Sequence, residues 1–181
     1  MIIGVTSRFH SKPLPLRKDE FSELEWQRME YDEIIAGFQS LKAPDFDPMN
    51  INARGLERLK ELTDALMGIS ERERAIPELF GVMERLPDAH LGSPGPLVHT
   101  LEALKGYENE LIRSVRRSPS LLSVWMVNRI LNTDLPSDLR QSYMAVLDEA
   151  AARPDVSKAV REDARDFVEL QTRKHRESSS C

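Results

Sequence analysis

The chain has little cysteine, few aromatic residues and no long hydrophobic run. Its one cysteine is Cys181, so no internal disulfide can stabilise the fold, and the ending ESSSC lacks the spacing of a prenylation signal. No apolar run approaches the roughly 20 residues that a membrane-spanning helix needs. The segment MIIGVTSRFHSKPL lacks the basic region and the long apolar region of a signal peptide. We therefore expect a cytoplasmic protein with no membrane partner.

Positive charge is also scarce. The chain carries 25 Lys and Arg against 30 Asp and Glu, which gives a formal net charge of -5. Surfaces that bind nucleic acid or anionic lipid carry an excess of Lys and Arg, so the composition argues against a nucleic-acid partner. With 181 residues, of which 40% are hydrophobic, the chain can form one domain with a buried core.

Motifs of catalysis, phosphate binding and metal binding are missing. No serine stands in a G-x-S-x-G turn, and the GSPG sequence at 92–95 lacks the GxxxxGK[ST] pattern of a phosphate-binding loop. His90, His99 and Glu102 are the remaining candidates for a metal site, but no cysteine or HExxH motif supports them. We expect no enzyme, no metal and no cofactor, although a helical fold can hold an apolar ligand pocket without any motif.

Helical periodicity dominates the chain after residues 2–9, which could form a short strand or an extended arm. Apolar residues at steps of three and four form one clear stripe, made of Leu56, Leu59, Leu62, Leu66 and Ile69. The pattern predicts an all-α fold of about eight helices. They are expected near residues 19–41, 53–69, 71–86, 97–104, 107–117, 119–132, 138–153 and 156–175.

Three features locate particular helices. Residues 121–131 are apolar on almost every side, which is typical of a helix packed inside a fold. Ser118 is expected to cap this helix, with Pro119 at its first position. Pro77 is expected to kink or restart the third helix near Ile76, because proline cannot donate a backbone hydrogen bond.

The domain organisation follows from these elements. We expect one helical domain over 1–181, with its helices packed as antiparallel hairpins in a HEAT-like short solenoid or an irregular bundle. The last helix, PDVSKAVREDARDFVEL, is similar to the second helix of a HEAT-type repeat. Four parts are expected: an extended arm at 1–18, an acidic helical hairpin at 19–70, a helical-repeat core at 71–175 and a disordered tail at 176–181.

Basic residues gather at Arg113, Arg116 and Arg117, with Arg129 nearby in the sequence. A nucleic-acid site would need more positive charge and interleaved aromatic side chains. Cations in the last turn of a helix complement its dipole, and we interpret the cluster in this structural way.

Acidic residues gather between residues 19 and 47. One interpretation is a solvated helix face, with Asp45 and Asp47 capping or ending helices. The other is a surface that steers a basic partner, with Trp26, Tyr31 and Phe46 as exposed hot-spot side chains. The predicted partner-binding residues are Glu20, Glu23, Glu25, Trp26, Glu30, Tyr31, Asp32, Glu33, Asp45 and Asp47.

Three segments occur in a characteristic order: GSPGPLVHTLEAL at 92–104, YENEL at 107–111 and SPSLLSVWMVNRILN at 118–132. This order resembles a family of small helical bacterial immunity proteins, encoded with polymorphic toxins of the contact-dependent inhibition or Rhs type. The resemblance covers roughly residues 75–172. The positions that match its pattern look like scaffold: Gly92, Pro94, Gly95, Pro96, His99, Trp125, Asn128 and Arg129.

The resemblance implies a protein without catalytic activity that binds one cognate toxin C-terminal domain and blocks it stoichiometrically. No toxin-contacting residue is carried over, because such positions vary in families of this kind. The acidic N-terminal region lies outside the pattern and is the expected toxin-facing surface, with a basic nuclease as the toxin that its charge favours.

Two alternatives remain. The first is a HEAT-type helical scaffold or adaptor that binds another protein partner. The second is an enzyme or metal protein centred on His90, His99 and Glu102.

Overall fold

The computed structural model describes residues 23–178, and it describes side chains over 30–177. Every regular element in this range is helical, which confirms the predicted all-α fold, and no described helix has the length and hydropathy to cross a membrane. The elements are α1 (Glu23–Ser40), η2 (Ala43–Phe46), α2 (Gly55–Met67), η3 (Arg72–Ala75), α3 (Ile76–Arg85), α4 (Pro96–Ala103), α5 (Tyr107–Arg117), α6 (Leu121–Leu131), α7 (Ser137–Ala152) and α8 (Lys158–Ser178).

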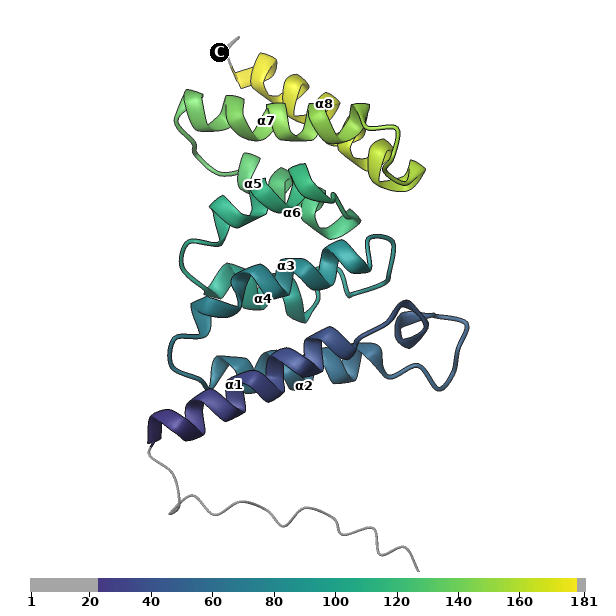
Figure 1. The fold of residues 1–181 in the computed structure, drawn as a ribbon. Coiled ribbons are helices and arrows are strands. Elements are labelled where there is room, and N and C mark those ends of the chain that lie inside the picture. Colours follow the sequence, from purple (N-terminus) through teal and green to yellow (C-terminus); the bar gives the residue numbers. More distant parts are fainter. Residues whose placement is uncertain (1–22, 179–181) are drawn as a thin grey trace, which may run out of the picture.

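The eight α-helices of the described range form four hairpins stacked one on another, from α1 and α2 at one end to α7 and α8 at the other (Figure 1). Successive odd-numbered helices pack on each other, so that α1, α3, α5 and α7 form one layer. On the other side, α2 packs on α4 and α6 packs on α8. The hairpins are therefore arranged in two layers, and their assignment to HEAT repeats stays a prediction.

The hydrophobic core runs through the stack, and α6 lies at its centre. This helix packs against α3, α5, α7 and α8. Its apolar side chains are buried on several sides, as the sequence predicts for 121–131. Burying one Val, Leu or Met side chain stabilises a fold by about 1.5–3 kcal/mol, so α6 is a major source of stability.

The start of α6 differs from the prediction. Ser120 is the N-cap, because its Oγ accepts a hydrogen bond from the Ser123 N–H at 3.1 Å and its own N–H donates to Ser123 Oγ at 2.9 Å. This reciprocal capping places Pro119 outside the helix. Ser118 instead ends α5, where its N–H donates to the Ser114 carbonyl oxygen at 2.8 Å.

Two other predictions have opposite outcomes. The restart at Pro77 is confirmed, since η3 ends at Ala75 and α3 begins at Ile76 with Pro77 in its first turn. In the stripe of α2, however, Leu56 is 45% exposed while the later members are buried. Leu56 is only the second residue of α2, and it lies beside the connecting loop, away from the packed part of the helix.

The loop between α3 and α4 makes a tight turn at its glycines. Gly92 has φ of +93°, a left-handed conformation that side chains strongly disfavour. A Cβ on Gly95 would collide with the Leu91 carbonyl oxygen and would lie 2.7 Å from the Gly92 Cα. The close approach of these two glycines allows Pro96 to begin α4 directly after the turn.

Replacing Gly95 with alanine is expected to lower the free energy of unfolding by about 1–3 kcal/mol, because the collision is with backbone atoms that cannot move freely. Gly81→Ala is the matched control. Gly81 lies inside α3, and its new Cβ would stand 3.4 Å from the flexible end of Arg85. Alanine should therefore stabilise α3 by up to about 1 kcal/mol. Urea denaturation measures both signs, and a Gly95→Ala variant of unchanged stability would contradict the turn geometry.

Candidate partner-binding surface

The ten predicted partner-binding residues fall into separate groups. Glu20 lies outside the described residues. Glu23, Glu25 and Trp26 belong to α1, but their side chains also lie outside the described residues. The remaining six are described, and the structure divides them between the middle of α1 and the connection that follows this helix.

On α1 the acidic side chains point in different directions. Glu30 and Glu33 are exposed and line a groove of about 470 Å³ between α1 and α2, together with Arg58 and Glu61. Asp32 is exposed as well, but residues two apart on a helix do not share a face. Glu30 and Glu33 therefore form an acidic rim at the end of the stack, and Asp32 is not part of it.

Tyr31 has a packing contact. Its ring lies under the guanidinium of Arg74, with 4.4 Å between the guanidinium carbon and the ring centroid. Burial raises the pKa of the Tyr31 hydroxyl, and the positive charge of Arg74 partly opposes this rise. Tyr31 is half-buried and joins α1 to η3, so it offers a partner little free aromatic surface.

Asp45 and Asp47 stabilise the chain after α1 through local hydrogen bonds. Asp45 Oδ2 accepts from the Lys42 N–H at 2.8 Å, and Asp47 Oδ1 accepts from the Met49 N–H at 2.9 Å. These are the capping and turn roles that the structural interpretation predicts. The part of α1 from Glu33 to Ser40, about 10 Å long, lies between the acidic rim and the segment that holds Asp45 and Asp47.

Phe46 is buried, with 6% of its surface exposed, so the prediction that it is an exposed hot spot is wrong. It lies at the end of η2 and packs into the core beside Gly55, where a Cβ would stand 2.8 Å from the Phe46 ring. The hydrophobicity of the ring decides this outcome. The short η2 helix turns Phe46 toward the core while the neighbouring Asp47 remains exposed to water.

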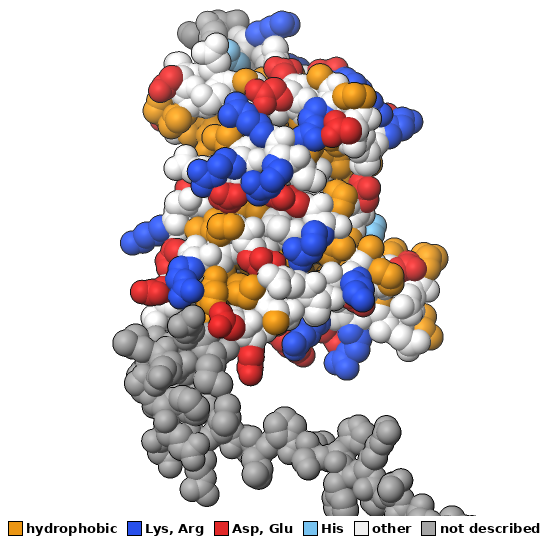
Figure 2. All heavy atoms as spheres, viewed as in Figure 1, with side chains coloured by type: hydrophobic (Ala, Val, Ile, Leu, Met, Phe, Trp, Pro, Cys, Tyr) orange, Lys and Arg blue, Asp and Glu red, His pale blue; other side chains and the backbone are white. Residues whose placement is uncertain are grey.

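The exposed apolar side chains of this region are instead Met49 and Ile51, with 84% and 97% of their surfaces exposed. They lie in the segment 47–54, here called the loop tip, which extends beyond the helices of the stack (Figure 1). Figure 2 shows hydrophobic side chains, in orange, gathered on this protrusion at the lower right of the view. The sequence signal is two apolar residues inside the turn-rich segment DPMNIN.

Backbone hydrogen bonds hold the loop tip in successive turns. The Asn50 N–H donates to the Asp47 carbonyl oxygen at 3.0 Å, and the Ala53 N–H donates to the Asn50 carbonyl oxygen at 2.9 Å. Asn50 Oδ1 also accepts from the Asn52 N–H at 3.0 Å. Because these turns are already formed, the backbone that carries Met49 and Ile51 loses less conformational entropy when a partner binds.

The basic cluster is engaged in ion pairs between hairpins. Arg117 bonds Glu84 of α3 at 2.6 and 2.9 Å and Glu110 of its own helix at 3.2 Å. Arg116 bonds Glu149 of α7 at 3.0 and 3.4 Å. The hydrogen bonds that Arg117 donates to Glu84 and Glu110 raise the pKa of its guanidinium above the ordinary value. The charges of Arg116 and Arg117 are neutralised within the layer formed by the odd-numbered helices α1, α3, α5 and α7. This favours the structural interpretation of the basic cluster.

Arg129 links the layer on the other side of the stack. It donates to both oxygens of Glu102 on α4, at 2.7 and 3.1 Å, and its guanidinium lies 4.9 Å from the Trp125 ring centroid. Arg129 therefore connects α6 to α4 and covers the ring of Trp125 on its own helix. Both carboxylate oxygens of Glu102 are engaged by Arg129.

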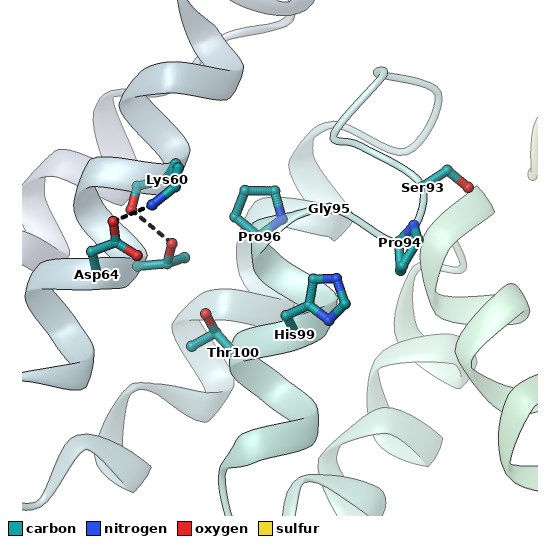
Figure 3. Close-up of a pocket in the computed structure, with 9 residues that line it drawn as sticks. Lys60, Asp64, Ser93, Pro94, Gly95, Pro96, His99 and Thr100 are labelled. Atoms are coloured by element: carbon teal, nitrogen blue, oxygen red, sulfur yellow. Dashed lines mark hydrogen bonds and ion pairs between the residues drawn. The ribbon is translucent and has the colours of Figure 1, made fainter.

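The histidines of the metal hypothesis lie in different places. His99 borders a groove of about 460 Å³ between α2 and α4, opposite the ion pair of Lys60 and Asp64 (Figure 3). His90 borders another cavity, beside Phe46 and the α3–α4 loop. Across residues 23–178 no group of three or more His, Cys, Asp or Glu side chains is placed to hold a metal ion. The hypothesis of a site built from His90, His99 and Glu102 has no geometric support.

Comparison of the chain with protein-family models, curated proteins and solved structures gave no match.

Replacing Arg117 with methionine is expected to lower the free energy of unfolding by about 1–2 kcal/mol, because two largely buried carboxylates would lose a charged donor. The side chains of Glu84 and Glu110 are only 15% and 10% exposed. Arg54→Met is the control, since Arg54 pairs with Glu57 where both side chains are well exposed. This control should leave stability nearly unchanged. Equal effects of the two substitutions in urea denaturation would contradict a stabilising role for the Arg117 contacts.

Proposed function

We propose that this chain is an immunity protein, which binds a cognate bacterial toxin domain and neutralises it by stoichiometric occlusion, without catalysis. The observation that carries the proposal is the exposure of Met49 and Ile51 on a preformed loop. Exposed apolar side chains that gather in one patch, as on the loop tip, mark sites of protein contact. The proposal places the protein in the cytoplasm, where it would meet an incoming toxin.

Charge around the loop tip favours a basic partner. Between residues 30 and 64 the chain has eight acidic residues against four basic ones. Glu30 and Glu33 are exposed on α1, which belongs to the same hairpin as the loop tip. An acidic surface accelerates encounter with a basic protein and selects against acidic ones. Many nucleic-acid-cleaving domains present basic clefts to their substrate, and this supports a nuclease as the toxin.

The division of the chain supports the same proposal. Residues that carry the resemblance to immunity proteins take part in packing, as Arg129 illustrates through its bond to Glu102 of the preceding hairpin and its contact with Trp125. The first hairpin lies largely outside that resemblance and presents the exposed apolar groups. A conserved type of scaffold with a separate recognition hairpin suits a family whose members each bind a different toxin.

The second candidate is a helical scaffold or adaptor that binds another protein. It is favoured by the stacking of four hairpins, because such stacks offer long continuous surfaces. Co-expression with the product of the adjacent upstream gene separates the two functions. Rescue of growth from that product supports the immunity function. If the upstream product is not toxic, or if its toxicity persists, the immunity proposal fails.

The double substitution Met49→Ser and Ile51→Ser is expected to weaken binding of that upstream toxin domain about tenfold or more. Loss of two buried apolar contacts removes at least the roughly 1.4 kcal/mol that corresponds to tenfold in affinity. Isothermal titration calorimetry measures the change. Leu139→Ser is the control, because Leu139 is an exposed leucine on α7 at the other end of the stack. Unchanged affinity of the double variant would rule out the loop tip as the binding site.

Neutralising the acidic rim with Glu30→Gln and Glu33→Gln is expected to slow association with the toxin domain and to reduce its dependence on salt. Exposed charges act over a Debye length of about 10 Å at 0.1 M salt, so the effect should vanish at high ionic strength. Stopped-flow association rates at low and high salt give the measurement. Identical salt dependence in the variant and the unsubstituted protein would refute steering by this rim.

A further inference from the structure

A cavity of about 840 Å³ lies at the opposite end of the stack from the loop tip. It is bordered by the ends of α6 and α8, by the beginning of α7 and by the connection between α6 and α7. In Figure 1 this is the end where α8 finishes, near the C-terminus. Sites for small organic ligands have volumes of about 300–1,000 Å³, so the cavity is large enough for one such ligand.

The lining of the cavity is amphipathic. Its apolar side chains are Leu131, Leu135 and Met144. Its ionisable side chains are mainly basic, with Asp134 as the acidic member of the lining, and the basic ones are Arg140, Lys174, His175 and Arg176. A ligand that matches both parts has an apolar body and a negatively charged group.

A network of hydrogen bonds fixes the polar wall. Gln171, which is 2% exposed, donates through Nε2 to Asn128 Oδ1 at 2.7 Å and to Asn132 Oδ1 at 3.0 Å. Lys174 Nζ donates to the same Asn132 oxygen at 2.7 Å. The ammonium group is therefore held at the end of α6 through Asn132, by a network whose inner bond, between Gln171 and Asn128, is buried.

The helix dipole accounts for the positions of the basic lining residues on α8, but it does not account for Arg140 on α7. Lys174, His175 and Arg176 are near the end of α8, where positive charge complements the helix dipole. Arg140 is in the first turn of α7, where the dipole disfavours a cation. Its Nη2 donates to the Thr133 carbonyl oxygen at 3.2 Å, which holds the guanidinium toward the α6–α7 connection that borders the cavity.

We propose that this cavity binds a small organic anion with an apolar body, in the class of aliphatic or aromatic carboxylates and sulfonates. Leu135 and Met144 contact the apolar body, Leu131 forms the floor behind them, and Arg140 and Lys174 bind the anionic group. Guanidinium and ammonium donors form charge-assisted hydrogen bonds with such groups. The site is independent of the proposed immunity function, because it shares no residue with the first hairpin.

Fluorescence titration with 8-anilinonaphthalene-1-sulfonate tests the site, with uncharged N-phenyl-1-naphthylamine as the matched probe that lacks the sulfonate. The sulfonate probe is expected to bind saturably with a stoichiometry of one. The uncharged probe is expected to bind about tenfold more weakly or worse, because it cannot use the charged donors. Absence of saturable binding, or equal affinity of the two probes, would overturn the proposal.

Three variants locate the binding. Arg140→Gln should reduce affinity for the sulfonate about tenfold and leave the uncharged probe unaffected. Met144→Trp should reduce binding of both probes, because it fills the cavity from its apolar side. Arg165→Gln is the control, since Arg165 is exposed on α8 and does not border the cavity. Thermal unfolding verifies that each variant folds. If Met144→Trp does not fold, the test of the site rests on the affinity of Arg140→Gln for the sulfonate probe. Sulfonate binding that Arg140→Gln leaves unchanged would overturn the assignment.

Discussion

Burial of α6 among α3, α5, α7 and α8 is the contact on which the rest of the stack depends. A hairpin of two amphipathic helices cannot bury both of its apolar sides alone, so each hairpin needs its neighbours. Through α6 the third hairpin contacts both the second and the fourth. The side chains of Val124, Val127 and Leu131 supply this contact with at most 1% of their surfaces exposed. Without it, the last hairpin would lose most of the apolar surface that supports it.

Electrostatic contacts follow the same division into layers. Arginines link successive helices of the odd-numbered layer: Arg85 donates to the Phe38 carbonyl oxygen of α1, Arg117 to Glu84 and Arg116 to Glu149. These contacts neutralise charge in the middle of the stack. Acidic excess is then concentrated on the first hairpin, and basic side chains gather at the cavity beside the last. The two ends of the stack therefore carry opposite charge, which is the basis of the two binding proposals.

This separation gives a physical account of how one scaffold can support specific recognition. Hairpins in the middle have neighbours on both sides, so their side chains are constrained by packing. Within residues 23–178 the first hairpin has a neighbour on one side only. Its connecting loop can vary in length and sequence with less effect on the core. The proposed recognition through Met49 and Ile51 could therefore change without disturbing the contacts of Arg117 or Arg129.

Much of the fold could be predicted from local chemistry in the sequence. The spacing of apolar residues predicted the helices, the bounds of α5 agree with the expected 107–117, and Pro77 located the restart of α3. The continuous hydrophobicity of 121–131 predicted a buried central helix. These features depend on periodicity and on the missing N–H of proline, which act within one or two turns of a helix.

The candidate sites were decided by the tertiary structure. Phe46 and Ile51 are both apolar residues of one connection, yet Phe46 is buried and Ile51 is exposed, because only Phe46 has a neighbouring surface to pack against. Arg117 bonds Glu84, which is 33 residues away in the sequence, and Lys174 bonds Asn132, which is 42 residues away. By itself the sequence determined which segments are helical and which of their faces are apolar. Which side chains meet across helices, and which remain in water, depends on how the hairpins stack, and no local pattern contains that information.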